Sequence, residues 1–315
     1  MGKKAPEKIF TAVQRGLAPA GLVLAGLVLV LTGIFFCRAP VILVEDEAFT
    51  LLYGKKRAFS AALALSLALF RPVKTAVVAP GAGPDLAAQA AAGLSPRPWG
   101  VFFPYRYREG ARRYLRNRPG FPVAVLAGRQ GAEESPGAGG EPLWIGTDTG
   151  TDLYRAGAAA GILTKKAGGT AVLYHTEPAE DQRRAFTGGF TGQGRPEGAL
   201  VFVSQAGSAE DPALPGTPGC VVLAGEGGAS MREAAAPLVL FTWLDPALVP
   251  RQGMLIFDDS PWAQLGPALE LLKKGENGAV PSQMVVLDSL RAMKQEYLAI
   301  NSLKTLKYNS KNTDN

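Results

Sequence analysis

From about residue 40 the chain alternates short apolar runs with longer stretches whose apolar residues recur at helical spacing. The apolar runs are, in order, PVILVED, VKTAVVAP, WGVFFPY and FPVAVLAG. The helical stretches between them are EAFTLLYGKKRAFSAALALSLALF, DLAAQAAAGL and EGARRYLRNR. Strands that are apolar on both faces and alternate with helices form parallel sheets covered on both sides. This half is therefore predicted to be a doubly wound α/β lobe.

The same alternation restarts after a loop rich in Gly, Glu and Ser at residues 129–142. The strand-like runs that follow are LWIGTD, TAVLYHT, ALVFVSQ, CVVLAG, LVLFTWLD, GMLIFDD and SQMVVLDSL. The helical stretches are TDLYRAGAAAGILTKKAG, AEDQRRAFTGGFTGQ, SMREAAAP and PWAQLGPALELLKKG. This pattern predicts a second α/β lobe in series with the first. Residues 303–315 are polar, lack apolar periodicity, and are predicted to be a disordered tail.

The segment from Gly16 to Cys37 contains no charged residue. A helix of roughly 20 apolar residues spans the hydrocarbon core of a bilayer. Residues 1–15 carry a cluster of positive charges, namely Lys3, Lys4, Lys8 and Arg15. Because positively charged flanks stay in the cytoplasm, residues 1–15 are predicted to be cytoplasmic. The chain from residue 38 onward is then expected on the extracytoplasmic, periplasmic face of the cell membrane.

This apolar segment can be an uncleaved signal anchor or a lipoprotein signal with lipid attachment at Cys37. The lipoprotein interpretation has the cysteine in the right place, but Phe36 occupies a position where a small residue is usual. Ordinary cleavage needs an A-x-A-like site, which is not present nearby. A buried helix of a globular domain is disfavoured because the run has no polar face. The anchor and the lipoprotein signal both stay open.

Charge and cysteine content exclude two other classes of protein. The net charge is +6, and part of the excess lies in the two ends of the chain, so the central part is near neutral. No concentrated basic region for nucleic acid is apparent, and no nucleic-acid partner is expected. The chain has two cysteines, Cys37 and Cys220, whose positions at the membrane boundary and in an apolar run make a disulfide improbable. The lobes must therefore be stabilised by their apolar cores.

Catalytic and cofactor motifs are absent from the sequence. The chain has a single histidine, His175, at the end of a predicted strand, and no HExxH, GxSxG, GxGxxG or GxxxxGK[ST] sequence. No metal site or cofactor is predicted, and the chain is not expected to be an enzyme. An enzyme with an acid–base pair near His175 stays as a minor alternative. Asp258 and Asp259 are adjacent on a strand and are predicted to point to opposite faces.

Ligands of open α/β sheets bind beyond the carboxyl ends of the strands. The polar residues predicted to lie there are Asp46, Arg129, Thr147, Asp148, Arg184, Glu226, Asp245 and Asp258. Aromatic residues in the same regions are Phe49, Phe103, Tyr105 and Trp243. Carboxylates, guanidinium groups and aromatic faces together suit a small polar ligand with a ring. The ordinary structural alternative for each strand-end carboxylate is to cap the next helix, and for Trp243 to pack in the core.

Four stretches resemble a known superfamily in order and spacing. They are FPVAVLAGRQ, IGTDTGTDLYRAGAAAGIL, GGTAVLYHTEPAEDQRRAFTGGF and LVLFTWLDPAL with GMLIFDDSPWAQLGPALELLKKG. Over about residues 40–295 the chain resembles the type I periplasmic binding proteins. This superfamily includes ribose- and galactose-binding proteins, the cores of lactose-type repressors, and the nucleoside-binding basic membrane lipoproteins of spirochaetes. The chain departs from it at Gly128, where the family has Asp, and at VLAGEGGAS, where Glu226 replaces an Asn-Asp pair.

The resemblance implies two lobes and a hinge between them. The N-terminal lobe would comprise residues 40–146 with about 259–278, and the C-terminal lobe residues 147–258 with about 282–295. Three crossovers, near 147–151, 257–260 and 278–283, would let the lobes close on a ligand.

The resemblance also implies ligand residues and partners. Arg184 and Asp245 would bind from the second lobe and Asp258 at the hinge. The further residues that it brings to the site are Asp46, Phe49, Arg129, Asp148, Glu226 and Trp243. The ligand would be a monosaccharide or a nucleoside, and the partner an ABC-type permease. A sensor or interaction module with a degenerate pocket is the alternative, and a membrane segment in place of a helix-turn-helix argues against a repressor.

Overall fold

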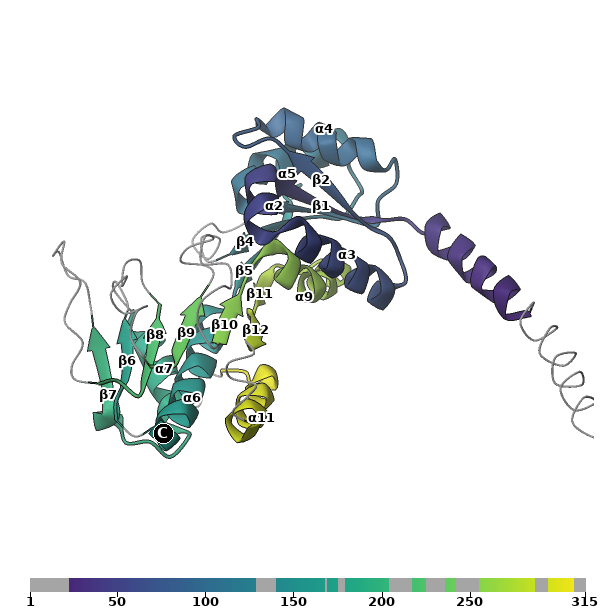
Figure 1. The fold of residues 1–315 in the computed structure, drawn as a ribbon. Coiled ribbons are helices and arrows are strands. Elements are labelled where there is room, and N and C mark those ends of the chain that lie inside the picture. The colour runs from purple at the N-terminus through teal and green to yellow at the C-terminus, as the bar shows by residue number, and fades with distance from the viewer. Residues whose placement is uncertain are drawn as a thin grey trace, which may run out of the picture.

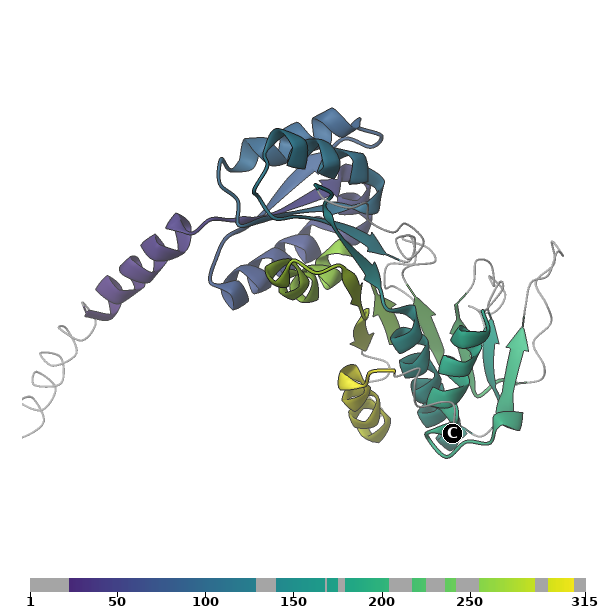
Figure 2. The same cartoon turned by 180° about the vertical axis from the view of Figure 1, so that it is seen from behind.

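The computed structural model describes residues 23–128, 140–167, 169–174, 179–203, 217–224, 236–241, 255–286 and 294–308. Figures 1 and 2 show these residues as two α/β lobes with a helix projecting from the first lobe. The predicted fold class, two doubly wound lobes built on parallel sheets, is confirmed.

The first lobe has a six-stranded sheet with the order β11-β5-β4-β3-β1-β2, in which neighbouring strands are all parallel. The strands are β1 Val41–Asp46, β2 Val73–Val78, β3 Gly100–Pro104, β4 Val123–Gly128, β5 Leu143–Thr147 and β11 Gly278–Val280. Strand β1 lies inside the sheet and every one of its residues is buried. Covered on both faces, it needs apolar side chains in both directions, which explains the continuous run VILV.

Two pairs of helices cover this sheet (Figure 1). The helices are α2 Glu47–Tyr53, α3 Lys55–Leu69, α4 Pro84–Leu94, α5 Arg108–Asn117 and α9 Pro261–Lys274, with a 3-10 turn, η1, at Tyr105–Tyr107. Helices α4 and α5 pack on one face, and α3 and α9 pack on the other. The prediction of a single helix between β1 and β2 is wrong in one respect, because the stretch forms two helices, α2 and α3. Gly54 has φ 94, and this left-handed conformation separates α2 from α3.

The second lobe has a six-stranded sheet with the order β12-β10-β9-β8-β6-β7. The strands are β6 Ala171–Tyr174, β7 Leu200–Val203, β8 Cys220–Leu223, β9 Leu238–Phe241, β10 Leu255–Asp258 and β12 Gln283–Val286. Only β12 runs antiparallel to its neighbour. The helices described here are α6 Thr149–Ala167, α7 Glu180–Thr191 and α11 Lys294–Ser302, with 3-10 turns η3 Glu197–Ala199 and η5 Leu303–Thr305. Cys220 is fully buried, and burial raises the pKa of its thiol to about 12, so it acts as a core residue.

Helices α6 and α7 pack with their backbones in contact. A Cβ atom placed on Gly157 would lie 2.0 Å from the carbonyl oxygen of Phe186, and one on Gly189 would lie 1.9 Å from that of Tyr154. Real Cβ atoms do not approach that closely, so only glycine fits at both positions. The small residues of these helices therefore determine how close the pair lies.

Within the described residues the chain crosses between the two sheets three times. It passes from β5 into α6, from β10 into α9, and from β11 into β12. The carboxyl ends of β5, β10 and β11 therefore all lie at the junction of the lobes. This is the arrangement in which two lobes turn about a shared set of strands.

The prediction of a disordered tail is wrong for residues 303–308. Leu303 is buried, and Leu306 and Tyr308 pack against the core of the second lobe. Arg155 of α6 donates hydrogen bonds of 2.8 Å to the carbonyl oxygens of Lys304 and Leu306. Three apolar side chains in a polar segment are enough to hold it against α6, although they form no periodic pattern. Residues 309–315 lie outside the described part of the chain.

The predicted membrane segment is described only at residues 23–37, which form a helix. Its residues 16–22 lie outside the described part of the chain. The apolar side chains of the helix are exposed, and Cys37 is an exposed thiol. The ring of Phe35 packs on that of Phe70, at 5.8 Å between centroids. In the part of the chain that the structure describes, we find no helix with the length and apolar character needed to cross a membrane.

Candidate functional site

The candidate site lies along the carboxyl edge of the first sheet, where its strands end and the crossovers begin. Because the strands of this sheet are parallel, the residues that follow β1, β3 and β5 share one edge. This is where ligands of α/β proteins bind. The sequence placed Asp46, Thr147 and Asp148 there, and the structure does so too.

Asp46, at the end of β1, is the centre of a polar cluster. One of its carboxylate oxygens accepts a 2.8 Å hydrogen bond from the amide of Ala48 and so caps α2. The other accepts hydrogen bonds from Arg106, at 2.9 Å, and from the hydroxyl of Tyr107, at 2.8 Å. The Asp46 carboxylate is nearly buried, whereas the Arg106 side chain is 59% exposed. The cluster thus presents an oriented guanidinium group to solvent above a buried carboxylate.

Tyr107 stays a hydrogen-bond donor in this cluster. Burial, and next the hydrogen bond to Asp46, raise the pKa of its phenol to about 12. Arg106 and Tyr107 belong to the 3-10 turn that directly follows β3. Neither residue was predicted from the sequence, where only Tyr105 of this turn was singled out. Their place immediately after a buried strand was the signal that could have identified them.

A second cluster joins the two lobes at the crossover from β10 to α9. Asp258, at the end of β10, is 2% exposed and accepts a 2.8 Å hydrogen bond from Arg57 of α3. The Arg57 guanidinium lies 4.2 Å above the ring of Tyr53. Burial, and next the charge of Asp258, raise the pKa of Tyr53, so its phenol also stays protonated. Arg57, which comes from the middle of a helix, was not predicted.

Asp259 and its neighbours hold the first two crossovers together. The hydroxyl of Thr147 donates to Asp259 at 3.2 Å and accepts from the side-chain amide of Gln264 at 2.7 Å. As a strand-end carboxylate, Asp258 had the alternative of capping the next helix, α9. The structure gives that role to Ser260, whose hydroxyl accepts from the amide of Ala263.

Asp148 and Phe49 have ordinary structural roles in this structure. The Asp148 carboxylate accepts a 2.9 Å hydrogen bond from the amide of Thr151 at the start of α6. Phe49 is partly buried and stacks on Tyr53, with 5.3 Å between ring centroids. Phe103 is fully buried in the core of the first lobe.

The third crossover is held by a buried carboxylate that the sequence did not single out. Asp152 of α6 is fully buried and accepts hydrogen bonds from the backbone amide of Ser282, at 2.9 Å, and from its hydroxyl. Burial raises the pKa of this carboxyl group to about 8. The contact joins the first turn of α6 to the strand connection between β11 and β12.

The remaining predicted ligand residues are not part of these clusters. Arg184 lies on α7, is 54% exposed, and its charged group is 3.7 Å from Glu180 one turn earlier. Five of the residues singled out from the sequence lie outside the described part of the chain, namely Arg129, His175, Glu226, Trp243 and Asp245. Among the described residues no group of His, Cys, Asp and Glu side chains has the arrangement of a metal site.

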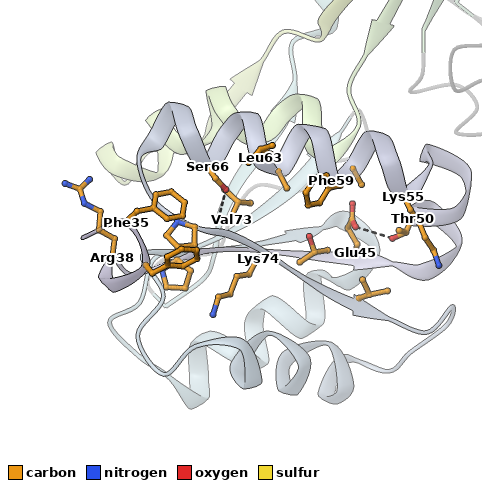
Figure 3. A pocket seen from close by; sticks show the side chains of 17 residues that line it. Phe35, Arg38, Glu45, Thr50, Lys55, Phe59, Leu63, Ser66, Val73 and Lys74 are labelled. Carbon is orange, nitrogen blue, oxygen red and sulfur yellow. Dashed lines mark hydrogen bonds between the residues drawn. The ribbon is translucent and has the colours of Figure 1, made fainter. Parts of the chain in front are cut away.

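Two cavities border the first sheet, and each reaches residues near its carboxyl edge. A groove of about 560 Å³ runs between α3 and β2, and Figure 3 shows Phe35 and Arg38 at one end of it and Lys55 and Thr50 at the other. A second cavity, of about 570 Å³, lies beside the third crossover, between α3, α9 and the start of β12. Both are lined mainly by apolar groups, which suits packing surfaces better than a site for a polar ligand.

No protein-family model and no curated protein matches the chain. Among solved structures, it is similar to an ABC transporter solute-binding protein from Conexibacter woesei DSM 14684 (14% identity, TM-score 0.50, 87% of this chain and 99% of that one). A transcriptional activator of the comK gene from Bacillus halodurans also matches (13% identity, TM-score 0.49, 86% and 99%). The likeness to the solute-binding protein, at 14% identity and a TM-score of 0.50, shows a common fold and not a common activity. The chain has the fold of the type I periplasmic binding proteins.

Proposed function

We propose that the chain is a solute-binding protein that closes its two lobes on a small polar ligand, a monosaccharide or a nucleoside. The observation that carries this proposal is the pair of Arg–Asp clusters at the carboxyl edge of the first sheet, one of which lies at a crossover. Arg57–Asp258 spans the lobes, and Arg106–Asp46 lies at the end of β1. Rotation of one lobe against the other changes the surroundings of both pairs.

Each guanidinium group retains hydrogen-bonding capacity for a ligand. Arginine has five N–H donors, and its contact with the partner carboxylate uses one of them in each cluster. The buried carboxylate holds the guanidinium plane in place, so little side-chain entropy is lost on binding. Arg57 and Arg106 remain 31% and 59% exposed, which makes their other donors accessible.

The charge balance of the site favours a neutral ligand. Each arginine is neutralised by an aspartate, so the two clusters carry no net charge. A phosphorylated ligand would require uncompensated positive charge, whereas hydroxyl groups need donors and acceptors in fixed positions. Sugars and nucleosides meet this requirement, and nucleosides add a flat base for an aromatic side chain.

Residues 16–37 would tether the lobes to the outer face of the cell membrane, as an anchor or through a lipid on Cys37. The ligand-loaded, closed form would then be presented to an ABC-type permease in the same membrane. Binding and release need no chemical step, so the proposed function is not enzymatic.

The proposal is tested by ligand binding to the full chain in nanodiscs. Thermal shift and calorimetry against ribose, galactose, arabinose, adenosine and uridine should identify one class that binds. Arg106→Ala should then weaken that binding at least about tenfold, because a ligand hydroxyl loses a charged donor. Arg113→Ala removes an exposed salt bridge between Arg113 of α5 and Asp85 of α4 and serves as the matched control. A folded protein that binds none of these compounds would refute the proposal.

A second candidate function is a sensor or interaction module without a transported solute. One observation favours it, namely that the described carboxylates of the carboxyl edge already have partners within the protein. Asp46 and Asp148 cap helices, and Asp258 pairs with Arg57. This candidate predicts no binding of any panel compound and no effect of Arg106→Ala. Co-purified small molecules, identified by mass spectrometry, would decide against it.

A further inference from the structure

The amino edge of the first sheet lies opposite the candidate site and next to the N-terminal helix. Only Arg38, Ala39 and Pro40 separate the helix at residues 23–37 from β1. Figures 1 and 2 show this helix leaving the first lobe on the side away from the second lobe. The amide of Val41 bonds to Pro72 and the amide of Trp99 bonds to Pro40, so the loops before β1, β2 and β3 are joined at this edge.

Positively charged side chains gather at this edge. We call the following group the basic edge: Arg38, Arg71, Lys74, Arg97, Arg116, Arg118 and Lys274. Some lie in the connections that lead into strands of the first sheet or at the beginning of a strand. The others lie at the ends of the helices that precede these strands. Separate in sequence, they come together because all strands of the sheet begin on the same side.

The charges of the basic edge are not neutralised within the part of the chain that the structure describes. No member forms a salt bridge there, and the side-chain hydrogen bonds that Arg38, Arg71, Lys74 and Arg118 donate go to uncharged carbonyl oxygens. Arg71, for example, donates to Ala39 at 2.8 Å, and Arg118 donates to Ser95 at 3.1 Å. Burial, and next the positive charge of Arg38, lower the pKa of Arg71, which is consistent with two cations close together.

Acidic residues near this edge do not offset the group. Glu141 is bound by Arg112, and Glu270 is bound by Lys273, which is therefore not counted in the basic edge. Glu276, in the turn between α9 and β11, is the remaining exposed carboxylate in the described loops there. A surface with this excess of positive charge attracts an anionic partner at low ionic strength.

The dipoles of the helices account for only part of this charge. Arg116 and Lys274 lie in the last turns of α5 and α9, where a cation is favourable. Arg38 directly follows the helix at residues 23–37 and donates to the carbonyl of Phe70, the C-cap of α3, and Arg71 follows that cap. Arg97 lies in the connection before β3 and complements no helix in this way.

Aromatic and apolar side chains accompany the basic edge. Arg71 lies 5.1 Å from the ring of Trp99, and Arg38 lies 5.1 Å from that of Phe70. Phe36 is 71% exposed, and Leu67, in the last turn of α3, is 66% exposed. Figure 3 shows Phe35 and Arg38 together at one end of the groove, with Lys74 between them and Glu45. Aromatic rings beside arginine and lysine are the composition that proteins place at the boundary between lipid and water.

We propose that the basic edge docks on anionic phospholipid headgroups of the membrane that holds the N-terminal segment. The short connection of residues 38–40 brings this surface to the membrane as soon as the helix is inserted. Docking would hold the first lobe upright, with its carboxyl edge and the second lobe pointing away from the bilayer. The proposal rests on the proposed tether and does not depend on ligand binding.

Hydrogen exchange of the full chain in nanodiscs tests the proposal. In discs that contain phosphatidylglycerol, amides of residues 70–74, 95–99 and 116–120 should exchange several-fold more slowly than in discs of phosphatidylcholine alone. The difference should disappear at high salt, because screening removes the attraction between headgroups and side chains. Incorporation into the discs checks the tether separately, so its failure is distinguishable from failed docking.

Two triple variants make the test specific. Arg97→Gln, Arg116→Gln and Lys274→Gln together remove exposed charges of the basic edge and should abolish the protection. Lys165→Gln, Lys304→Gln and Lys307→Gln remove the same charge from the second lobe and should leave the protection unchanged. Equal exchange in both kinds of disc would overturn the proposal. Protection that persists without anionic lipid or at high salt would indicate a protein partner, such as a second copy, and would overturn it too.

Discussion

Arg57 and Asp258 join the two lobes through an ion pair of 2.8 Å between residues 201 positions apart in the chain. Asp258 ends the strand that leads out of the second sheet, and Arg57 lies on a helix of the first lobe. The carboxylate is almost fully buried, and because Asp258 ends β10 where the chain crosses into α9, the pair lies at one of the three crossovers between the lobes.

Removal of Arg57 should destabilise the protein, because it leaves a buried carboxylate without a charged partner. Arg57→Ala is expected to lower the free energy of unfolding by about 1–3 kcal/mol, less than for a fully buried pair because Arg57 is partly exposed. Urea unfolding measures this change. The double variant Arg57→Ala/Asp258→Asn should recover part of the loss. Equal stability of Arg57→Ala and the wild type would show that the pair does not form in solution.

Asp46 should act both as a helix cap and as the partner of Arg106, and two substitutions separate the roles. Asp46→Asn keeps an oxygen that can accept from the amide of Ala48, whereas Asp46→Ala removes the cap. We expect Asp46→Ala to be about 1 kcal/mol less stable than Asp46→Asn, as measured by thermal or urea unfolding. Both variants lose the ion pair with Arg106, so any loss of ligand binding should be similar in the two. Equal stability would show that capping by Asp46 is unimportant.

Asp152 should make stability depend on pH. Its pKa is about 8 in the folded protein against an ordinary value of 3.8, so the folded state holds the proton more tightly than the unfolded state. The stabilisation from this group is fully present below about pH 4 and is lost as the pH rises through 8. Asp152→Asn should reduce this loss while keeping hydrogen bonds to Ser282. Unfolding at pH 5.5 and pH 8.5 measures the effect, and identical pH dependence in both proteins would contradict it.

The contact between α6 and α7 should not tolerate even one methyl group. A Cβ on Gly189 would lie 1.9 Å from the carbonyl oxygen of Tyr154, so the helices would have to separate. Gly189→Ala is expected to cost about 3 kcal/mol or more. The neighbouring Gly188→Ala is the control, because its Cβ would meet the Tyr154 ring at 3.8 Å and alanine is the better helix former. Thermal unfolding compares the two, and equal melting temperatures would show that the helices lie farther apart.

The sequence predicted the candidate site only in part. Asp46, Asp148 and Asp258 follow apolar runs directly, and that local signal placed them at strand ends. The capping alternative for strand-end carboxylates also holds for Asp46 and Asp148. Arg57 and Asp152 had no such signal, because they lie within helical stretches and reach the hinge through packing between distant segments.

The sequence by itself predicted the two α/β lobes and most of their strands and helices in order along the chain, but not β11, α11 or the antiparallel direction of β12. Apolar runs separated by helical periodicity depend on local backbone geometry and on burial of both faces of a strand, and both can be read from neighbouring residues. Only the tertiary structure decided which polar residues meet at the hinge, that Leu303 and Tyr308 pack against α6, and that seven cations share one edge. Those outcomes depend on contacts between residues far apart in the chain. The free energies of such contacts cannot be inferred from a local sequence pattern.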